Sequence, residues 1–297
     1  MPELPEVETV VRQIAPGVEK RTIRGLDLYW ARTLSGGTRA RVERAIVGAR
    51  IARSYRRAKW IVFELAAGRG ALLVHLRMTG RLFVRATKEP ASDYVRLSLA
   101  LSGGKRLDFE DVRKFGRVHW CADPNEVFES LGPEPLADDF TAEDLHMALT
   151  SRRRMLKPLL LDQTVVAGLG NIYVDETLFA SGLHPLTASD RLGRADTERI
   201  HTNMRRILAR AIECQGSSFD VFYRTPEGQP GRFQDEFLAY GRDGRPCRNC
   251  GTELIKLTVA QRGTHVCPVC QPKPRRRRVA KKKRTARRTD TTSTSRP

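Results

Sequence analysis

The sequence predicts an α+β fold of several domains: a strand-rich N-terminal domain, a helical domain, a small cysteine-bearing module and a disordered tail. Three observations support this prediction. Residues 95–101 alternate apolar and polar side chains, which is the period of a half-buried strand. Residues 200–211 instead repeat their apolar side chains at helical spacing. Two Cys-x2-Cys pairs lie within 247–270, and the 297 residues are enough for two domains with separate cores.

Residues 1–16 are expected to form the first helix. Pro5 suits the first helical position, and the acidic Glu6 and Glu8 complement the helix dipole in the first turn. Apolar side chains recur at i, i+3, i+4 and i+7, giving one buried stripe (Val7, Val10, Val11 and Ile14). Pro16-Gly17 is expected to end this helix.

Short strands are expected from about residue 20 to residue 120. The strand at 95–101 is followed by Gly103-Gly104, which predicts a hairpin with 106–109. Residues 61–65 and 71–76 are similar short apolar runs. Turn-linked strands of this kind are typical of a β-sandwich or a barrel, and we predict a β-sandwich domain with flanking helices over residues 1–130.

The rest of the chain divides at changes in composition. Residues 132–135, Gly-Pro-Glu-Pro, suggest an interdomain linker, so the helical domain is assigned to 131–240 and the cysteine module to 241–271. Residues 272–297 hold twelve Lys or Arg and one acidic residue, a net charge of +11. Without aromatic side chains this tail cannot form a core, and we predict that it is disordered.

The two cysteine pairs predict a structural zinc site. Cys247, Cys250, Cys267 and Cys270 have the spacing of a four-cysteine zinc finger. Disulfides are the alternative, but the chain has no signal peptide or membrane-length apolar run and is expected to be intracellular. Four sulfur ligands leave no position for a catalytic water. Cys121 and Cys214 lack partners and are interpreted as core thiols.

The charge indicates a polyanionic partner. The net charge of the whole chain is +19, and subtracting +11 for the tail leaves +8 for the remainder. A basic folded part favours nucleic acid first and an anionic membrane second.

The start of the chain, Met-Pro-Glu-Leu-Pro-Glu, suits covalent chemistry. Removal of Met1 would leave Pro2 with a free secondary amine, and an α-amino group titrates near ~8. Such an amine can attack C1′ of a nucleotide sugar, and the resulting iminium ion acidifies the C2′ proton. Glu3 and Glu6 lie within one helical turn, as an acid–base pair would. Capping of the helix is the structural alternative.

Several motifs resemble the bacterial formamidopyrimidine-DNA glycosylase family. Besides residues 1–8, they are Arg57-Ala58-Lys59, residues 75–80 (His-Leu-Arg-Met-Thr-Gly), residues 113–116 (Arg-Lys-Phe-Gly), residues 131–136 (Leu-Gly-Pro-Glu-Pro-Leu), residues 161–163 leading to 168–173, and the finger with Gln261-Arg262. These motifs occur in the family's order from residue 1 to about 271. The resemblance implies a helix–two-turn–helix DNA-binding domain around Gly168–Asn171.

The resemblance also implies residue roles. Pro2 would be the nucleophile, Glu3 the general acid at the sugar ring oxygen, Glu6 a supporting carboxylate, and Lys59 a phosphate contact beside the lesion. His75, Asn171 and Arg262 would contact DNA phosphates. Met78, Arg113 and Phe115 would fill the gap left when the damaged base leaves the stack, with Arg113 facing the estranged cytosine. Taken alone, Met78 and Phe115 would be core residues, His75 a core histidine and Lys59 an exposed strand residue.

The implied activity is base-excision repair by a bifunctional glycosylase and AP lyase acting on 8-oxoguanine and formamidopyrimidines through a Pro2 Schiff base with β,δ-elimination. Its partner would be damaged double-stranded DNA, and the protein would be a monomer that holds one zinc ion. It would be located in the bacterial cytoplasm and associated with the nucleoid. The alternatives are the same chemistry on oxidised pyrimidines, as in endonuclease VIII, and a non-catalytic DNA-binding protein. Leu4 favours the formamidopyrimidine branch. The lesion-reading loop would fall near 216–232, where Ser217 and Ser218 suit the family and Asp220 departs from it.

Overall fold

The structure is a computed structural model that describes residues 1–218 and 223–274. Its N-terminal half is a β-sandwich, as predicted, and two helices flank it: α1 (Leu4–Val18) and α2 (Arg39–Ile46). One sheet has the order β1-β7-β8-β6 and the other β2-β9-β5-β4-β3. Apolar side chains from both sheets and from α1 and α2 form one core.

The strands of the first sheet are β1 (Ile23–Leu28), β6 (Gly80–Ala86), β7 (Val95–Leu101) and β8 (Lys105–Asp111). The second sheet contains β2 (Leu34–Ser35), β3 (Ile51–Arg57), β4 (Trp60–Leu65), β5 (Ala71–His75) and β9 (Arg117–Cys121). Strands β7 and β8 pair antiparallel, which confirms the predicted hairpin. Short helices η1 (Ala31–Thr33) and α3 (Asn125–Phe128) complete this half.

The first helix differs from its predicted limits of 1–16. It begins at Leu4, leaving Pro2 and Glu3 ahead of it, and it continues through Pro16 to Val18. A proline removes only its own N–H, and the next turn still closes because the amide of Glu19 donates to the carbonyl of Ala15 at 2.9 Å. Burial of Val18 in the sandwich core stabilises this last turn.

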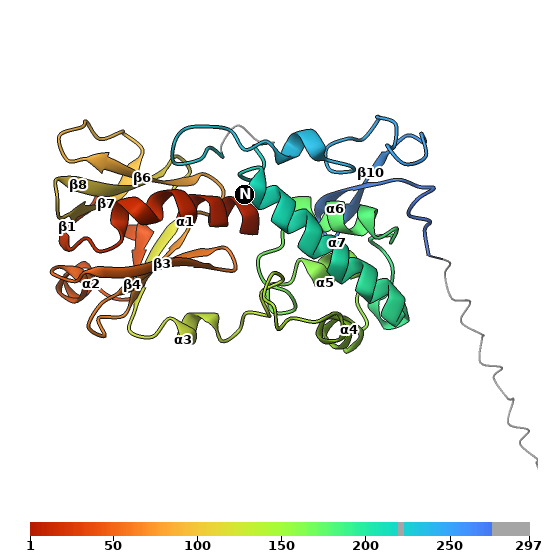
Figure 1. Cartoon of the computed structure of the whole chain (residues 1–297), viewed down its shortest axis with the longest axis horizontal. Helices are drawn as coiled ribbons and strands as arrows, with labels where there is room; N and C mark the ends of the chain where they lie inside the picture. The colour runs from red at the N-terminus through yellow and green to blue at the C-terminus, as the bar shows by residue number, and fades with distance from the viewer. Residues whose placement is uncertain (219–222, 275–297) are drawn as a thin grey trace, which may run out of the picture.

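The helical half contains α4 (Ala142–Thr150), α5 (Leu156–Leu160), α6 (Asn171–Ala180), η2 (Ser189–Arg191), α7 (Arg194–Glu213) and η3 (Phe233–Glu236). Its apolar side chains form a second core, which includes Leu4 at the start of α1. Helix α1 therefore joins both cores, and the N-terminus lies where the two halves meet (Figure 1).

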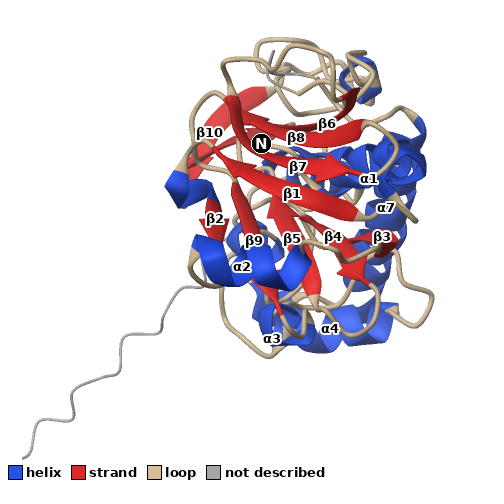
Figure 2. Ribbon diagram, turned by 90° about the vertical axis from the view of Figure 1, so that its left-hand side faces the viewer, coloured by secondary structure: helices blue, strands red, loops and turns tan. Residues whose placement is uncertain are grey.

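The cysteine module is built on a hairpin of β10 (Ile255–Val259) and β11 (Arg262–Val266). Strands β2 and β10 lie along the same side of the molecule (Figure 2), so the two halves share one face. Within the described residues no helix has the length and apolar character needed to span a bilayer. Most of the tail assigned to 272–297 falls outside the described residues.

Candidate active site

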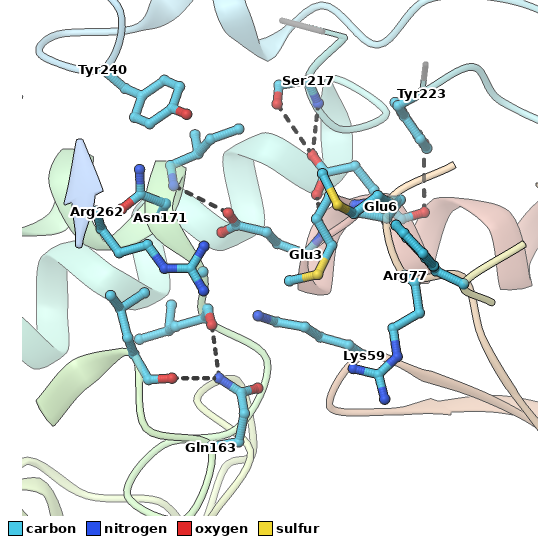
Figure 3. Close-up of a pocket in the computed structure, with 18 of the residues that line it drawn as sticks. Glu3, Glu6, Lys59, Arg77, Gln163, Asn171, Ser217, Tyr223, Tyr240 and Arg262 are labelled. Atoms are coloured by element: carbon cyan, nitrogen blue, oxygen red, sulfur yellow. Dashed lines mark hydrogen bonds between the residues drawn. The ribbon is translucent and has the colours of Figure 1, made fainter. Parts of the chain in front are cut away.

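A cavity of about 740 Å³ lies at the junction of the two halves (Figure 3). Eight of the ten residues given a catalytic or DNA-contacting role from the sequence line it: Pro2, Glu3, Glu6, Lys59, Met78, Phe115, Asn171 and Arg262. They come from α1, from the turns of both sheets, from α6 and from the β10–β11 hairpin. His75 and Arg113 are absent from the lining of this cavity.

Glu3 is held by the N-terminus of α6. Its Oε1 accepts the amide of Ile172 at 3.1 Å and its Oε2 that of Tyr173 at 3.4 Å. A β-carbon on Gly170 would lie 2.3 Å from the Glu3 carboxyl carbon, so only glycine permits this approach. Burial raises the pKa of Glu3, while the Lys59 ammonium and the two amides oppose that rise. A carboxyl group with a raised pKa is suited to donate a proton.

Glu6 is fully enclosed by hydrogen-bond donors. Its Oε2 accepts the backbone amide of Glu3 at 2.8 Å, and its Oε1 accepts the Tyr173 hydroxyl at 2.6 Å and the Ser217 amide at 2.8 Å. Burial, and then the charge of Glu3, raise the pKa of Glu6 to about 7. Glu6 thus holds the backbone of Glu3 in place and can change protonation near neutral pH.

Lys59 reaches the cavity from the turn between β3 and β4. Ala58 there has a φ of 53°, and its amide donates to Glu134 Oε1 at 2.5 Å, which fixes the turn. The Lys59 side chain is buried and points into the cavity (Figure 3). Burial lowers the pKa of its ammonium group, and the carboxylates of Glu3 and Glu6 counteract this.

Asn171 and Arg262 face the cavity from the opposite wall (Figure 3). Asn171 Nδ2 donates to the carbonyl of Gly263 at 3.0 Å, which links α6 to the hairpin. The buried Lys157 adds a second link, because its ammonium group donates to Asp175 at 2.6 Å and to Thr264 at 2.8 Å. These bonds fix the hairpin tip, and therefore Arg262, relative to the cavity.

Met78 and Phe115 are not core residues, because they are 41% and 48% exposed. The loop after β8 that carries Phe115 is held by Asp111, whose carboxylate accepts the amides of Arg113 at 3.1 Å and Gly116 at 2.6 Å. The Arg113 guanidinium lies 4.9 Å from the centre of the Phe115 ring. The structure thus presents an exposed cation and an exposed aromatic ring beside the cavity.

His75 is buried behind the cavity wall. Its Nδ1 accepts the amide of Arg77 at 3.0 Å, and its ring packs edge-on against Trp60. Burial, with Arg77 and Lys59 nearby, lowers the pKa of His75 to about 3, so the ring is neutral. These contacts agree with the core histidine that was the alternative interpretation.

The cavity lining includes Gln163, Tyr223 and Tyr240, which were assigned no role from the sequence. Tyr173 was also assigned none, and it does not line the cavity but donates to Glu6. The Tyr223 hydroxyl donates to the carbonyl of Gln215 at 3.1 Å. Gln163 shapes the turn before α6 by donating to the carbonyl of Leu169 at 2.9 Å and accepting the amide of Gly168 at 2.9 Å. Gln163 and Tyr173 lie within the family-like motifs, which was the available signal. Asp220, noted in the expected lesion-reading loop, lies outside the described residues.

The four cysteines of the module are brought together. All of their Sγ atoms lie within 4.8 Å of one another, with 3.9 Å between Cys247 and Cys270 and 3.5 Å between Cys250 and Cys267. Tetrahedral zinc with Zn–S bonds of about 2.3 Å requires sulfur atoms about 3.8 Å apart. The geometry therefore fits one structural zinc ion. Cys121 and Cys214 are buried elsewhere.

The fold and site define a class: proteins in which a β-sandwich, a helix–two-turn–helix domain and a zinc finger surround one cavity lined by both acidic and basic side chains. Family models match all three parts: the formamidopyrimidine-DNA glycosylase N-terminal domain at residues 1–118, its H2TH domain at 131–223, and the zinc finger found in FPG and IleRS at 244–273. The chain is 44% identical over 274 residues to formamidopyrimidine-DNA glycosylase of Chloroflexus aggregans, covering 91% of this chain and 98% of that protein. It is 39% identical to the Geobacillus kaustophilus enzyme, covering 91% of this chain and all of that protein. The chain belongs to the formamidopyrimidine-DNA glycosylase family.

Solved structures of formamidopyrimidine-DNA glycosylases have the same fold as this chain. A mutant of the Lactococcus lactis enzyme in complex with Fapy-dG-containing DNA superposes with a TM-score of 0.84 at 34% identity, and 92% of this chain covers all of that chain. The Thermus thermophilus MutM (FPG) protein gives a TM-score of 0.82 at 38% identity, with the same coverage. These likenesses extend over the whole described fold rather than one domain.

Proposed function

We propose that this chain is a bifunctional DNA glycosylase and AP lyase that excises oxidised purines, 8-oxoguanine and formamidopyrimidines, from double-stranded DNA. The observation that carries the proposal is the convergence of the chain's first residues with Glu3 and Lys59 in one cavity. Similar proteins support the substrate class, because they have been solved with DNA containing Fapy-dG or carbocyclic 8-oxoguanine.

In the proposed reaction, the secondary amine of Pro2 attacks C1′ once Met1 is gone. The bond from C1′ to the base breaks, and the base leaves with the bonding electrons and takes up a proton. Glu3 protonates the sugar ring oxygen as the ring opens to an iminium ion. Loss of a C2′ proton then expels the 3′ phosphate, and a second elimination expels the 5′ phosphate.

The remaining residues are proposed to bind DNA around this centre. Lys59, Asn171 and Arg262 contact phosphates, since they bring two cations and a helix N-terminus to one cavity. His75, buried and neutral, supports the turn at Arg77 that leads to Met78. Met78, Arg113 and Phe115 fill the space that the extruded base leaves.

We also propose the domain limits 1–130, 131–240 and 241–271, because the two large cores and the hairpin core fall broadly within them. The protein would act as a monomer in the bacterial cytoplasm, associated with the nucleoid. Light scattering of the free and DNA-bound protein would test the monomer.

Borohydride trapping tests the nucleophile. Incubation with an 8-oxoguanine:cytosine duplex and borohydride should yield a covalent adduct that peptide mass spectrometry locates at Pro2. A chain that retains Met1, made by blocking methionine removal, should give no adduct, whereas Pro16→Ala, at an exposed proline of the same helix, should react normally. An adduct at Lys59, or on the Met1-retaining chain, would contradict the mechanism.

A duplex containing thymine glycol tests the lesion class. The proposal expects faster release of 8-oxoguanine than of thymine glycol under single-turnover conditions. The opposite order would indicate an endonuclease VIII-like enzyme, and salt-sensitive binding without strand cleavage on either duplex would indicate a non-catalytic DNA-binding protein.

A further inference from the structure

A second surface lies beside the loop that carries Arg113 and Phe115, outside the cavity. We define the aromatic–basic surface by five residues: Tyr29, Trp30, Arg32, Tyr94 and Lys114. Tyr29 and Tyr94 are 60% and 50% exposed, which is unusual for aromatic side chains of a folded protein. None of the five residues lines the cavity.

Backbone contacts hold this surface together. The amides of Tyr29 and Trp30 both donate to the carbonyl of Arg96, at 3.0 Å and 3.2 Å. The carbonyl of Tyr94 accepts the amide of Asp111 at 2.9 Å, and Asp111 is the residue that anchors the Phe115 loop. Asp111 therefore contacts both the aromatic–basic surface and the Phe115 loop.

The loop has two faces. Phe115 lines the cavity, whereas the ammonium group of Lys114 lies 4.2 Å from the centre of the Trp30 ring, on the aromatic–basic surface. Lys114 has a φ of 60°, the left-handed conformation. The backbone turns there, so that the adjacent side chains of Lys114 and Phe115 reach different surfaces. One loop thus joins the catalytic cavity to the second surface.

The cations of this surface lack carboxylate partners. Among the described residues, Arg32 and Lys114 form no ion pair, and both are exposed. The acidic Asp93 lies beside Tyr94 in the sequence, and its backbone carbonyl accepts from Arg96 at 3.0 Å. Exposed aromatic rings beside unpaired cations are typical of surfaces that contact nucleic-acid backbone and bases.

We infer that the aromatic–basic surface binds the undamaged strand of the DNA duplex. The inference rests on the proposed function, which places Arg113 and Phe115 in the gap left by the extruded base. The damaged strand then occupies the cavity side of the loop, so its complement lies on the other side, where Trp30 and Lys114 are. Strands β2, which follows Arg32 closely, and β10 lie along the same side of the molecule (Figure 2), as one continuous DNA-binding face requires.

The chemistry of the surface divides between its residues. Arg32 would contact a phosphate of the undamaged strand, and the exposed Tyr29 and Tyr94 rings would pack against its sugars, with their hydroxyl groups toward the phosphates. Lys114, already fixed on Trp30, adds positive charge next to the estranged base.

Double-mutant cycles with neutral DNA linkages test this inference. Equilibrium binding of the full chain is measured on a duplex with a tetrahydrofuran abasic site, which the enzyme cannot process. Single methylphosphonate linkages are placed at each of three positions on either side of the estranged cytosine, and separately in the damaged strand. Arg32→Ala is compared with wild type and with Arg24→Ala, an exposed arginine on β1 that does not belong to the aromatic–basic surface.

Arg32→Ala should weaken binding about fivefold and lower the slope of log K against log salt by about 0.9, the value for one lost phosphate contact. At one linkage of the undamaged strand, the methylphosphonate should weaken wild-type binding by the same factor and leave the binding of Arg32→Ala unchanged. Arg24→Ala should behave as wild type. Tyr29→Ala should weaken binding without changing the salt slope.

Coupling of Arg32 to a damaged-strand linkage, or to no linkage, would overturn the inference. A wild-type chain that fails to prefer the abasic duplex over an undamaged one would instead refute the proposed function, so the two failures are distinguishable.

Discussion

Replacing Tyr173 with phenylalanine removes one hydroxyl group from the centre of the site. That hydroxyl donates to Glu6 Oε1 at 2.6 Å, and Tyr173 is fully buried. The bond favours the ionised carboxylate and therefore lowers the pKa of Glu6, opposing the burial that raises it to about 7. Without the hydroxyl, the pKa of Glu6 should rise further.

The magnitude follows from the strength of the bond. A hydrogen bond to a charged group contributes about 1.5–3 kcal/mol, and about 1.4 kcal/mol corresponds to one pH unit. The same oxygen keeps the Ser217 amide at 2.8 Å. Because that donor partly compensates, the shift should be at the lower end, about one pH unit.

The assay is the pH dependence of single-turnover base excision between pH 5.5 and pH 9.5. In Tyr173→Phe the inflection that belongs to Glu6, near neutral pH in wild type, should move about one unit toward alkaline pH. Tyr55→Phe is the matched control, since its hydroxyl forms no hydrogen bond among the described residues. An unchanged profile, or one shifted toward acid, would refute the assignment of Tyr173 as the residue that positions Glu6.

Three further outcomes are expected. Gly170→Ala should displace Glu3, because the new β-carbon would lie 2.3 Å from its carboxyl carbon, and single-turnover excision should fall at least about a hundredfold. The control Gly193→Ala, at the N-cap of α7, should excise at the wild-type rate. A normal rate in Gly170→Ala would contradict the role of Glu3. The raised pKa of Glu6 means that its folded form binds a proton between about pH 4.5 and 7, so its contribution to stability is lost as pH rises through 7. From pH 5 to pH 8 wild type should therefore lose about 2.5 kcal/mol more unfolding free energy than Glu6→Gln in urea titrations. Parallel curves would contradict the burial of that charge. Chelation should release one zinc ion per chain and weaken DNA binding by freeing Arg262, whereas Cys214→Ser should keep its zinc, since its thiol lies outside the cluster of four. Undiminished binding after zinc loss would show that the hydrogen bonds from Lys157 and Asn171 hold the hairpin without the metal.

The strands and the zinc ligands could be predicted because their signals are local. Alternation over Val95–Leu101 and the spacing of the four cysteines each lie within a few dozen residues. The end of α1 was predicted wrongly because the burial of Val18 against a distant sheet outweighs the local preference of Pro16. Tertiary packing, absent from a local pattern, decides such boundaries.

The partners of the candidate site could not be predicted in this way. Glu3 contacts Ile172 and Glu6 contacts Ser217, pairs separated by 169 and 211 residues. The family motifs identified most of the cavity's residues, but they implied nothing about which atoms meet. His75 shows the limit: its motif neighbour Met78 reaches the cavity, whereas His75 lies behind the wall because its ring packs on Trp60.

The position of the cavity follows from two exchanges between the halves. Leu4, from the helix that covers the sandwich, is buried in the helical core, and Tyr223, from the helical half, is buried in the sandwich core. Each half therefore holds a residue of the other in its core. Glu3 lies directly before α1, whereas its amide donors Ile172 and Tyr173 lie in the first turn of α6, so a small shift between the halves would break both bonds to the carboxylate. The proposed acid is positioned only when both halves are packed together, which explains why the proposed catalytic residues lie at the junction of the two cores rather than within either one.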